Sequence, residues 1–251
     1  MLDIKGKKEL FIGIPKLDKY INSFNTAEIS IIGGRILTGK TFLASTIARN
    51  IVLNNEVKVG FFNFELDCFS YNSTIYNKNE EEKLVKSKLF IENCSARTLL
   101  FSELLKKIVE LVSEKNVEVI IINTVQYITC KKGLNIIKAL YKIATKLNIS
   151  IIIFSNLKRN IEYRKYPKEA VITDLNTNFG GRFFNLAKPA IKYASNIMLL
   201  YFEDEFYRSI NENEYNINIK YEKINGLAKK MSTKIFRYRR NLDRSSSYGL
   251  V

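Results

Sequence analysis

The feature that most constrains this chain is a glycine loop set between a short apolar run and a segment of helical periodicity. Residues 34–41 read GRILTGKT, which has the spacing G-x-x-x-x-G-K-[ST]. In such a loop backbone N–H groups surround phosphate oxygens, the lysine reaches the terminal phosphates and the hydroxyl serves Mg²⁺. Residues 29–32 predict a strand before it, and residues 42–51 a helix after it. The pattern predicts a site for a nucleoside triphosphate such as ATP, with Mg²⁺, at Gly34, Thr38, Gly39, Lys40 and Thr41.

Further along, short apolar runs alternate with segments of helical spacing. The runs have the lengths of buried strands, and the periodic segments between them are long enough for helices. Such alternation predicts a parallel sheet with helices on both faces. The predicted strands are residues 57–64, 117–122, 149–154 and 197–202, and the predicted helices include residues 99–112 and 134–147.

The carboxyl-terminal part has a different pattern. Residues 215–221 and 233–238 flank Asn225-Gly226, a dipeptide typical of hairpin turns. We therefore expect an α/β fold, with a mostly parallel sheet flanked by helices and a carboxyl-terminal antiparallel hairpin. We expect one large domain at 26–242, a lead-in at 1–25 and a tail at 243–251, with a long functional loop region at 156–188.

Composition narrows the class of partner. The chain has 40 Lys and Arg against 25 Asp and Glu, a formal charge of +15, which favours nucleic acid; a solvated basic surface is the alternative. Three cysteines without metal-ligand spacing, and no histidine, argue against zinc and predict reduced thiols in the cytoplasm. No apolar run approaches about 18 residues and no signal peptide is evident, so we expect no membrane span.

Several further motifs accompany the glycine loop, one before it and the others after it. Leu17-Asp18 precedes it, while Phe64-Glu65-Leu66 and Asn123-Thr124-Val125-Gln126 end predicted strands. The segment SNLKRNIEYR at 155–164, Asp174-Leu175 and DEFY at 204–207 come next. This order resembles the motor domain of DnaB-type replicative DNA helicases, in the RecA-like ATPase superfamily. The resemblance implies a RecA-like phosphate-loop NTPase core that hydrolyses ATP, and a homo-oligomeric ring, which is a hexamer in the family.

The resemblance also implies roles for single residues. Glu65 would orient the attacking water, with Lys40 as its catalytic partner on the phosphates. Asn123 stands where the family has an aspartate that holds a Mg²⁺-bound water, so it keeps an acceptor but drops the charge. Asn156 stands where the family has a glutamine that senses the γ-phosphate. The family's Lys-x-Arg pair ahead of Asn-Gly is replaced here by Glu222, Lys223 and Ile224. A substitute cation would require a different hairpin register, and the candidates are Lys223, Arg237, Arg239 and Arg240. A solvated basic strand face is the alternative for the arginines.

A basic segment after residue 157 is the candidate contact for single-stranded DNA. Lysine and arginine suit backbone phosphates, and interleaved tyrosines suit stacking on splayed bases. A charged loop without a ligand is the alternative. The candidate residues are Lys158, Arg159, Arg164 and Lys165, with Arg182, Lys188 and Lys192 extending the track.

The leading hypothesis is an ATP-driven DNA helicase motor that translocates on single-stranded DNA during replication. We expect the family's amino-terminal domain to be absent, and a separate primase or loader protein as a partner. A second hypothesis is a nucleotide-binding but catalytically weak accessory protein, motivated by Asn123 and the displaced Lys-x-Arg pair. A third is a RecA or circadian-clock-type ATPase, which fits residues 155–164 less well.

Overall fold

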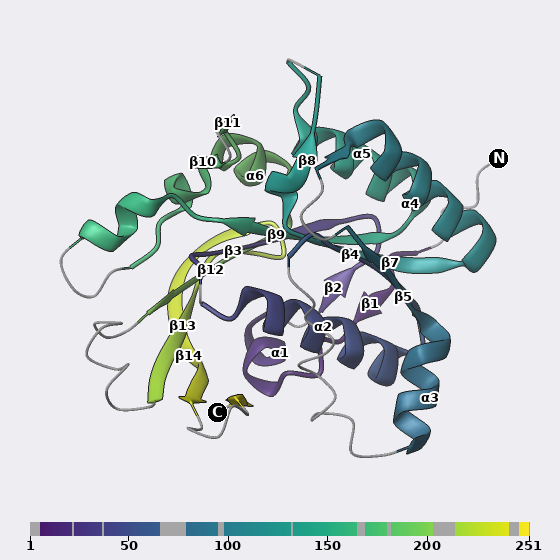
Figure 1. Ribbon diagram of the computed structural model, residues 1–251, viewed down its shortest axis with the longest axis horizontal. Coiled ribbons are helices and arrows are strands. Elements are labelled where there is room, and N and C mark those ends of the chain that lie inside the picture. Colours follow the sequence, from purple (N-terminus) through teal and green to yellow (C-terminus); the bar gives the residue numbers. More distant parts are fainter. Residues whose placement is uncertain are drawn as a thin grey trace.

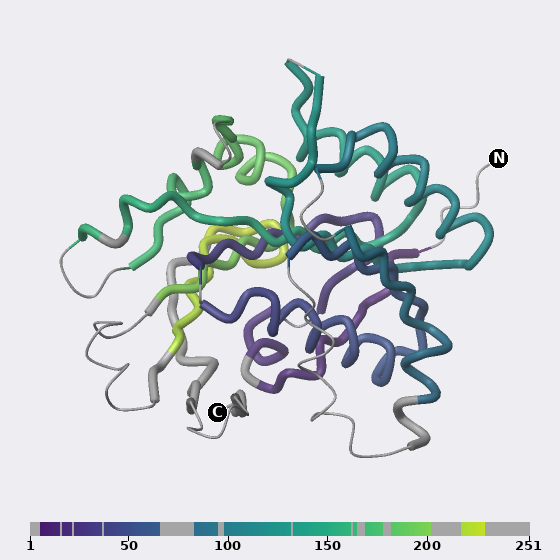
Figure 2. Tube along the Cα trace, viewed as in Figure 1, coloured from purple at the N-terminus to yellow at the C-terminus, as the bar shows by residue number. Residues whose placement is uncertain are grey.

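A nine-stranded sheet runs through the centre of the computed structural model, in the order β15-β14-β13-β12-β3-β9-β7-β4-β5. Figures 1 and 2 show the sheet between two layers of helices. The structure describes residues 6–21, 23–36, 38–65, 79–94, 98–131, 133–164, 169–179, 182–202, 214–240 and 246–250.

The central strands are parallel, as the alternating pattern predicts. Each pairs with its neighbour in the same direction, so that all six carboxyl ends point to one edge of the sheet. These strands are β3 (Ile29–Gly34), β4 (Lys58–Asn63), β5 (Leu89–Asn93), β7 (Val117–Asn123), β9 (Ser150–Asn156) and β12 (Asn196–Phe202).

The predicted carboxyl-terminal hairpin is confirmed. β13 (Glu214–Ile224) pairs antiparallel with β12 and with β14 (Leu227–Arg240). Asn225 and Gly226 form the turn with φ values of 47° and 82°, a left-handed conformation that these two residue types adopt at low cost. β15 (Ser246–Leu250) pairs with β14, so the segment predicted as a tail contributes the edge strand.

Helices cover both faces of the sheet (Figure 1). α1 (Pro15–Ile21), α2 (Lys40–Asn55) and α3 (Asn79–Lys88) pack on one face, and α4 (Phe101–Lys115), α5 (Ile136–Leu147) and α6 (Ala187–Tyr193) on the other. Side chains along each strand alternate between the layers: Ile121 joins the α2 layer and Ile120 the α4 layer. α4 and α5 each end at an asparagine in the left-handed conformation, Asn116 and Asn148, a common way to stop a helix.

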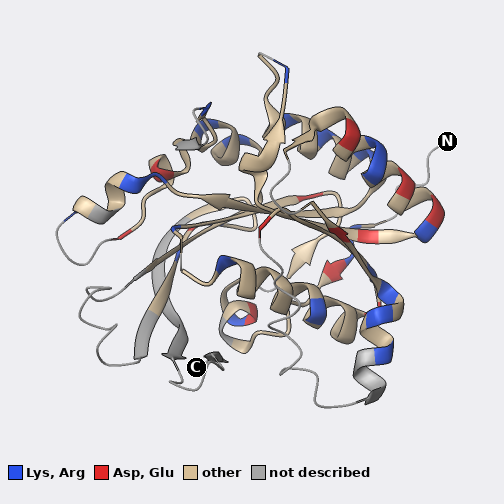
Figure 3. Ribbon diagram, in the orientation of Figure 1, with Lys and Arg blue, Asp and Glu red and all other residues tan. Residues whose placement is uncertain are grey.

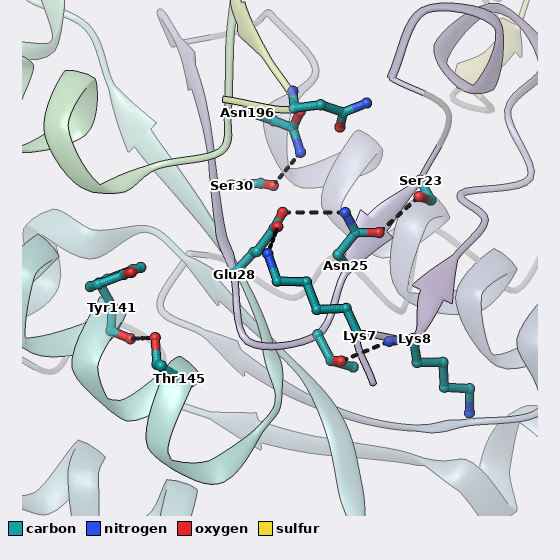
Figure 4. Close-up of polar contacts among 11 residues, drawn as sticks. Lys7, Lys8, Ser23, Asn25, Glu28, Ser30, Tyr141, Thr145 and Asn196 are labelled. Atoms are coloured by element: carbon teal, nitrogen blue, oxygen red, sulfur yellow. Dashed lines mark hydrogen bonds and ion pairs between the residues drawn. The ribbon is translucent and has the colours of Figure 1, made fainter. Parts of the chain in front are cut away.

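The predicted lead-in is built into the core. β1 (Glu9–Leu10) pairs with β2 (Phe24–Asn25), and Leu10, Leu17 and Phe24 are fully buried beside α2. Polar contacts close this amino-terminal edge of the sheet (Figure 4): Lys7 Nζ lies 2.6 Å from Glu28 Oε1, and Asn196 Nδ2 donates to Ser30 Oγ at 3.1 Å. The opposite edge is left for a ligand.

Short elements occupy the links between the main helices and strands. They are β6 (Leu99–Leu100), β8 (Ile128–Thr129), β10 (Thr177–Phe179) and β11 (Arg182–Phe184), with 3₁₀ helices at Val125–Tyr127, Arg159–Tyr163 and Ile172–Leu175. β6 takes up the first two residues of the predicted helix 99–112. None of the described helices has the length and apolar character needed to cross a membrane.

Candidate nucleotide site and basic face

The predicted site residues converge at the carboxyl edge of the parallel strands. β3, β4, β7 and β9 end at Gly34, Asn63, Asn123 and Asn156. Asn63 is the register partner of Asn123, and Gly34 is the register partner of Asn156. The phosphate loop leaves this edge at Gly34 and enters α2 at Lys40, so the helix N-terminus and its N–H groups face the same place.

Two positions of the phosphate loop require glycine. A Cβ on Gly34 would lie 2.5 Å from Thr38 Oγ1 and 2.9 Å from Lys40 Cγ. Gly39 has φ of +72°, where a side chain would be strained. Thr38 Oγ1 and Lys40 Nζ both donate to the carbonyl of Arg35, at 2.7 and 2.9 Å. Both side chains are therefore folded against the loop that would cradle phosphates.

Lys40 is buried, and its pKa is low for a lysine. It is 4% exposed, and burial lowers its pKa to about 8. The Glu65 carboxylate opposes this shift and the Arg35 guanidinium adds to it. Because its charged form is poorly stabilised, an anion beside Nζ would be strongly favoured there.

Thr41, Glu65 and Asn123 form one hydrogen-bonded group beside Lys40. The Thr41 hydroxyl donates to the Glu65 carboxylate, and Asn123 Nδ2 donates to Thr41 Oγ1 at 3.3 Å. Asn123 is fully buried, and its Oδ1 has no hydrogen-bond partner in the described part of the chain. A hydroxyl, a carboxylate and a spare amide oxygen are hard donors that suit Mg²⁺.

The donor set fits a magnesium–nucleotide complex better than a metal held by protein alone. No cluster of three or more Asp, Glu, Cys or His residues is present in the described ranges. Mg²⁺ commonly takes few protein ligands and completes its shell with water and substrate phosphates. Thr41 and Asn123 fit that arrangement, with the Glu65 carboxylate beside them.

Asn156 is held by Gln126, a residue to which the sequence motifs gave no role. Gln126 donates from Nε2 to the Asn156 carbonyl at 3.2 Å and to Ser155 Oγ at 2.8 Å, and it accepts the Asn156 N–H at 3.1 Å. The Oδ1 atom of Asn156 is buried and unpaired among the described residues. The sequence shows the motif that contains Gln126, but it does not show that Gln126 pairs with Asn156, 30 residues away.

Two cations of the basic segment after β9 pair with an internal carboxylate. Arg164 binds Asp174 through two nitrogens, at 2.7 and 2.5 Å, and Lys158 Nζ lies 3.5 Å from the same carboxylate. Asp174 is fully buried, so both cations neutralise an internal charge. Arg159 lies exposed on a 3₁₀ helix, and Lys165 is outside the described residues.

A second basic surface surrounds a cavity of about 670 Å³ between β8, β11 and α6. Phe183, 66% exposed, and Tyr193 lie among its cations. Arg182 Nη1 donates to Thr129 Oγ1 at 2.6 Å, which ties β11 to β8. The cationic residues of this basic cavity are Lys131, Arg182, Lys188 and Lys192, and Figure 3 colours such residues blue along this side of the molecule.

In this conformation Lys223 cannot take the place of the family's Lys-x-Arg pair, because its ammonium group is bound to backbone carbonyls. Its Nζ donates to the carbonyls of Ala194 and Ile191, at 2.5 and 3.0 Å, at the carboxyl end of α6. Burial lowers its pKa, partly offset by Glu28. Ile224 beside it is buried in the core. Lys223 therefore anchors the hairpin to α6.

Comparison with known proteins assigns the family. The model of the DnaB-like helicase C terminal domain matches residues 10–81 and 70–237. This chain belongs to the DnaB-like helicase C-terminal domain family. The resemblance expected from the motifs is thus confirmed.

Relatives of this DnaB-like chain are distant. It is 24% identical over 256 residues to the probable replicative DNA helicase of Trieres chinensis, covering 87% of this chain and 53% of that protein. It is 26% identical over 241 residues to the replicative DNA helicase DnaB of Rickettsia prowazekii (strain Madrid E), covering 80% and 47%. The chain spans about half the length of the curated relatives it matches.

Solved structures confirm the predicted fold class. A DnaB-like replicative helicase, studied with its interactions with primase, has a TM-score of 0.66 at 17% identity, covering 91% of this chain and 59% of that one. A second solved structure, of an isolated ATPase domain, has a TM-score of 0.65 at 16% identity, covering 97% and 92%. The α/β core with its antiparallel extension is therefore that of DnaB-like ATPase domains.

Proposed function

We propose that this chain is the ATP-hydrolysing motor of a replicative DNA helicase that moves along single-stranded DNA. Family membership supports this proposal, and so do the names of its relatives. The observation that carries it is the meeting of Lys40, Thr41, Glu65 and Asn123 at one edge of the sheet, where ligands of open α/β folds bind.

Each residue has a role that its position and chemistry support. Lys40 would leave the Arg35 carbonyl and bind the terminal phosphates, with Gly34, Thr38 and Gly39 forming the cradle. Thr41 and Asn123 would hold Mg²⁺, which when bound with ATP compensates charge on the phosphates. Glu65 would give up the Thr41 hydroxyl and orient the attacking water, and the unpaired Oδ1 of Asn156 would accept from a group beside the γ-phosphate.

The basic cavity is the surface that best suits DNA. Its four cations can neutralise backbone phosphates, and Phe183 offers an exposed ring for base stacking. Lys158 and Arg164 are committed to Asp174, which leaves them less suited to that role. Arg159 and Lys165 remain candidates for an extension of the track.

The family supports a proposal for the assembly and its partners. A homo-oligomeric ring, hexameric as in the family, would complete each site with a neighbouring subunit. A primase or a loader protein is the proposed protein partner, supported by the study of a DnaB-like helicase with primase. The cytoplasmic location stays a prediction.

The test is the ATPase rate with and without single-stranded DNA. The parent should hydrolyse ATP several-fold faster with DNA, and Lys40→Ala should fall to background. Lys106→Ala, at an exposed lysine on α4, is the matched control and should behave like the parent. A parent rate that DNA does not raise contradicts the motor; ATP binding with single-turnover hydrolysis near zero would instead indicate the accessory protein. Sizing with ATP bound tests the ring, which a monomer would refute.

A further inference from the structure

Asn63, the last residue of β4, lies at the centre of the nucleotide site although no motif contains it. Its side chain is 1% exposed. Nδ2 donates to the Glu65 carbonyl at 3.0 Å, and Oδ1 accepts the Glu65 N–H at 3.3 Å. The same Oδ1 accepts from Asn123 Nδ2 at 3.2 Å. One buried amide thus touches the backbone of Glu65 and the side chain of Asn123.

These contacts fix which way both amides face. A backbone N–H can only donate and a carbonyl can only accept, so Glu65 allows Asn63 a single orientation. Asn123 must then turn its Nδ2 toward Asn63 Oδ1, and that nitrogen also reaches Thr41 Oγ1. Asn123 Oδ1 is then buried and has no hydrogen-bond partner among the described residues. A carboxylate at position 123 would have no N–H to give Asn63.

We infer that Asn63 is a positioning residue for the proposed hydrolysis. It holds the backbone that presents the Glu65 carboxylate, and it turns the Asn123 amide so that its oxygen stays available to Mg²⁺ or its water. Asn63 and Asn123 form a matched pair, in which the neutral amide at 123 depends on the amide at 63. This inference rests on the proposed function and deepens it.

A purely local role for Asn63 is the competing explanation, since asparagine often stabilises the backbone where a strand ends. Asn196 offers a matched control at the opposite edge of the sheet. It is also fully buried, its Nδ2 donates to Ser30 Oγ at 3.1 Å (Figure 4) and its Oδ1 accepts the Asn225 N–H at 2.9 Å. Both asparagines support structure, but only Asn63 touches the site.

The first experiment compares Asn63→Ala with Asn196→Ala in kcat, KM and Tm. Asn63→Ala should lower kcat about 10- to 100-fold, because misplacing a reacting group has effects of that size. Its KM for ATP should rise by a clearly smaller factor than kcat falls, because the phosphate loop is untouched. Asn196→Ala should lower Tm as much or more while kcat stays within about twofold. Equal effects of the two variants on kcat would overturn the inference.

A double-mutant cycle tests the pair. If Asn63 acts partly through Asn123, Asn63→Ala should lower kcat by a clearly smaller factor in the Asn123→Ala background than in the parent, because contacting residues are not additive. Full additivity would contradict the matched pair.

Binding of a fluorescent, non-hydrolysable ATP analogue gives a readout that needs no turnover. Mg²⁺ should raise the affinity of the parent for the analogue, and in Asn63→Ala this rise should be at least about threefold smaller. The affinity measured without Mg²⁺ should differ between the two proteins by no more than about twofold. If the parent does not hydrolyse ATP, the proposed function fails, and this measurement alone decides the role of Asn63. An unchanged Mg²⁺-dependent gain overturns it. Should Asn63→Ala not fold, Asn63→Leu, which has a similar size and neither a donor nor an acceptor, replaces it throughout.

Discussion

The pairing of Arg164 with Asp174 gives the sharpest test of the basic segment. The sequence predicts Arg164 as a DNA contact. In the structure, Arg164 pairs with the fully buried carboxylate of Asp174. We expect Arg164→Met to destabilise the fold and to change the affinity for single-stranded DNA little at a temperature where both proteins are folded.

The expected magnitude follows from what remains around Asp174. Removing one partner of a buried ion pair costs about 3–5 kcal/mol. Lys158 Nζ at 3.5 Å and the Val171 N–H at 2.8 Å stay in place and compensate part of that charge. We therefore expect a loss at or below the lower end, about 2–3 kcal/mol, which for a domain of this size lowers Tm by about 4–12 °C.

Urea and thermal unfolding measure the loss, and fluorescence anisotropy with a single-stranded oligonucleotide measures binding. The matched control is the double variant Arg164→Met/Asp174→Asn, which removes the buried charge as well. It should recover about half of the lost stability, because a neutral amide leaves no uncompensated charge. An unchanged Tm for Arg164→Met together with a clear loss of DNA affinity would refute the reasoning and restore Arg164 as a DNA contact.

Three further predictions concern the nucleotide site and the basic cavity. Lys40 has a pKa of about 8 in the fold against an ordinary 10.5, so the unfolded chain binds more protons between those pH values and stability rises with pH across that window. Urea unfolding of Lys40→Met should lack this rise and show a gain of about 3 kcal/mol at pH 7; an identical pH slope would contradict the burial of Lys40. Gly34→Ala should abolish binding of an ATP analogue, whereas Gly60→Ala, whose Cβ would lie 2.9 Å from Ile120 and Leu111, should only lower Tm. Lys192→Ala should weaken binding of single-stranded DNA and reduce its salt dependence by about 0.7 in slope, and an unchanged slope would count against the basic cavity.

Much of the fold could be predicted because its signals are local. A parallel strand buried on both faces is a short apolar run, and the phosphate loop carries its own spacing. β15 and the short β1 and β2 could not be predicted with the same ease. Their few residues become strands through pairing with β14 and with each other, which is a tertiary effect.

The site divides in the same way. Lys40, Thr41 and Glu65 could be found because each follows a strand or lies in a motif. Asn63 carried no signal, because an asparagine at a strand end is ordinary until Asn123, 60 residues away, is seen beside it. The pairing of Arg164 could not be predicted for a related reason: a basic segment suggests a polyanion, and only the structure shows that the buried Asp174 supplies an anion internally.

The end of β7 connects the nucleotide site to the basic cavity by a short path. Asn123 belongs to the site, Gln126 holds the backbone of Asn156, and Thr129 accepts from Arg182 at the rim of the cavity. Seven residues, 123–129, span these three contacts, and Gln126 is buried with both of its amide atoms bonded. Residues 123–129 thus contact both the nucleotide site and the rim of the basic cavity, and under the proposed function this is the segment in which coupling between ATP and DNA is to be tested.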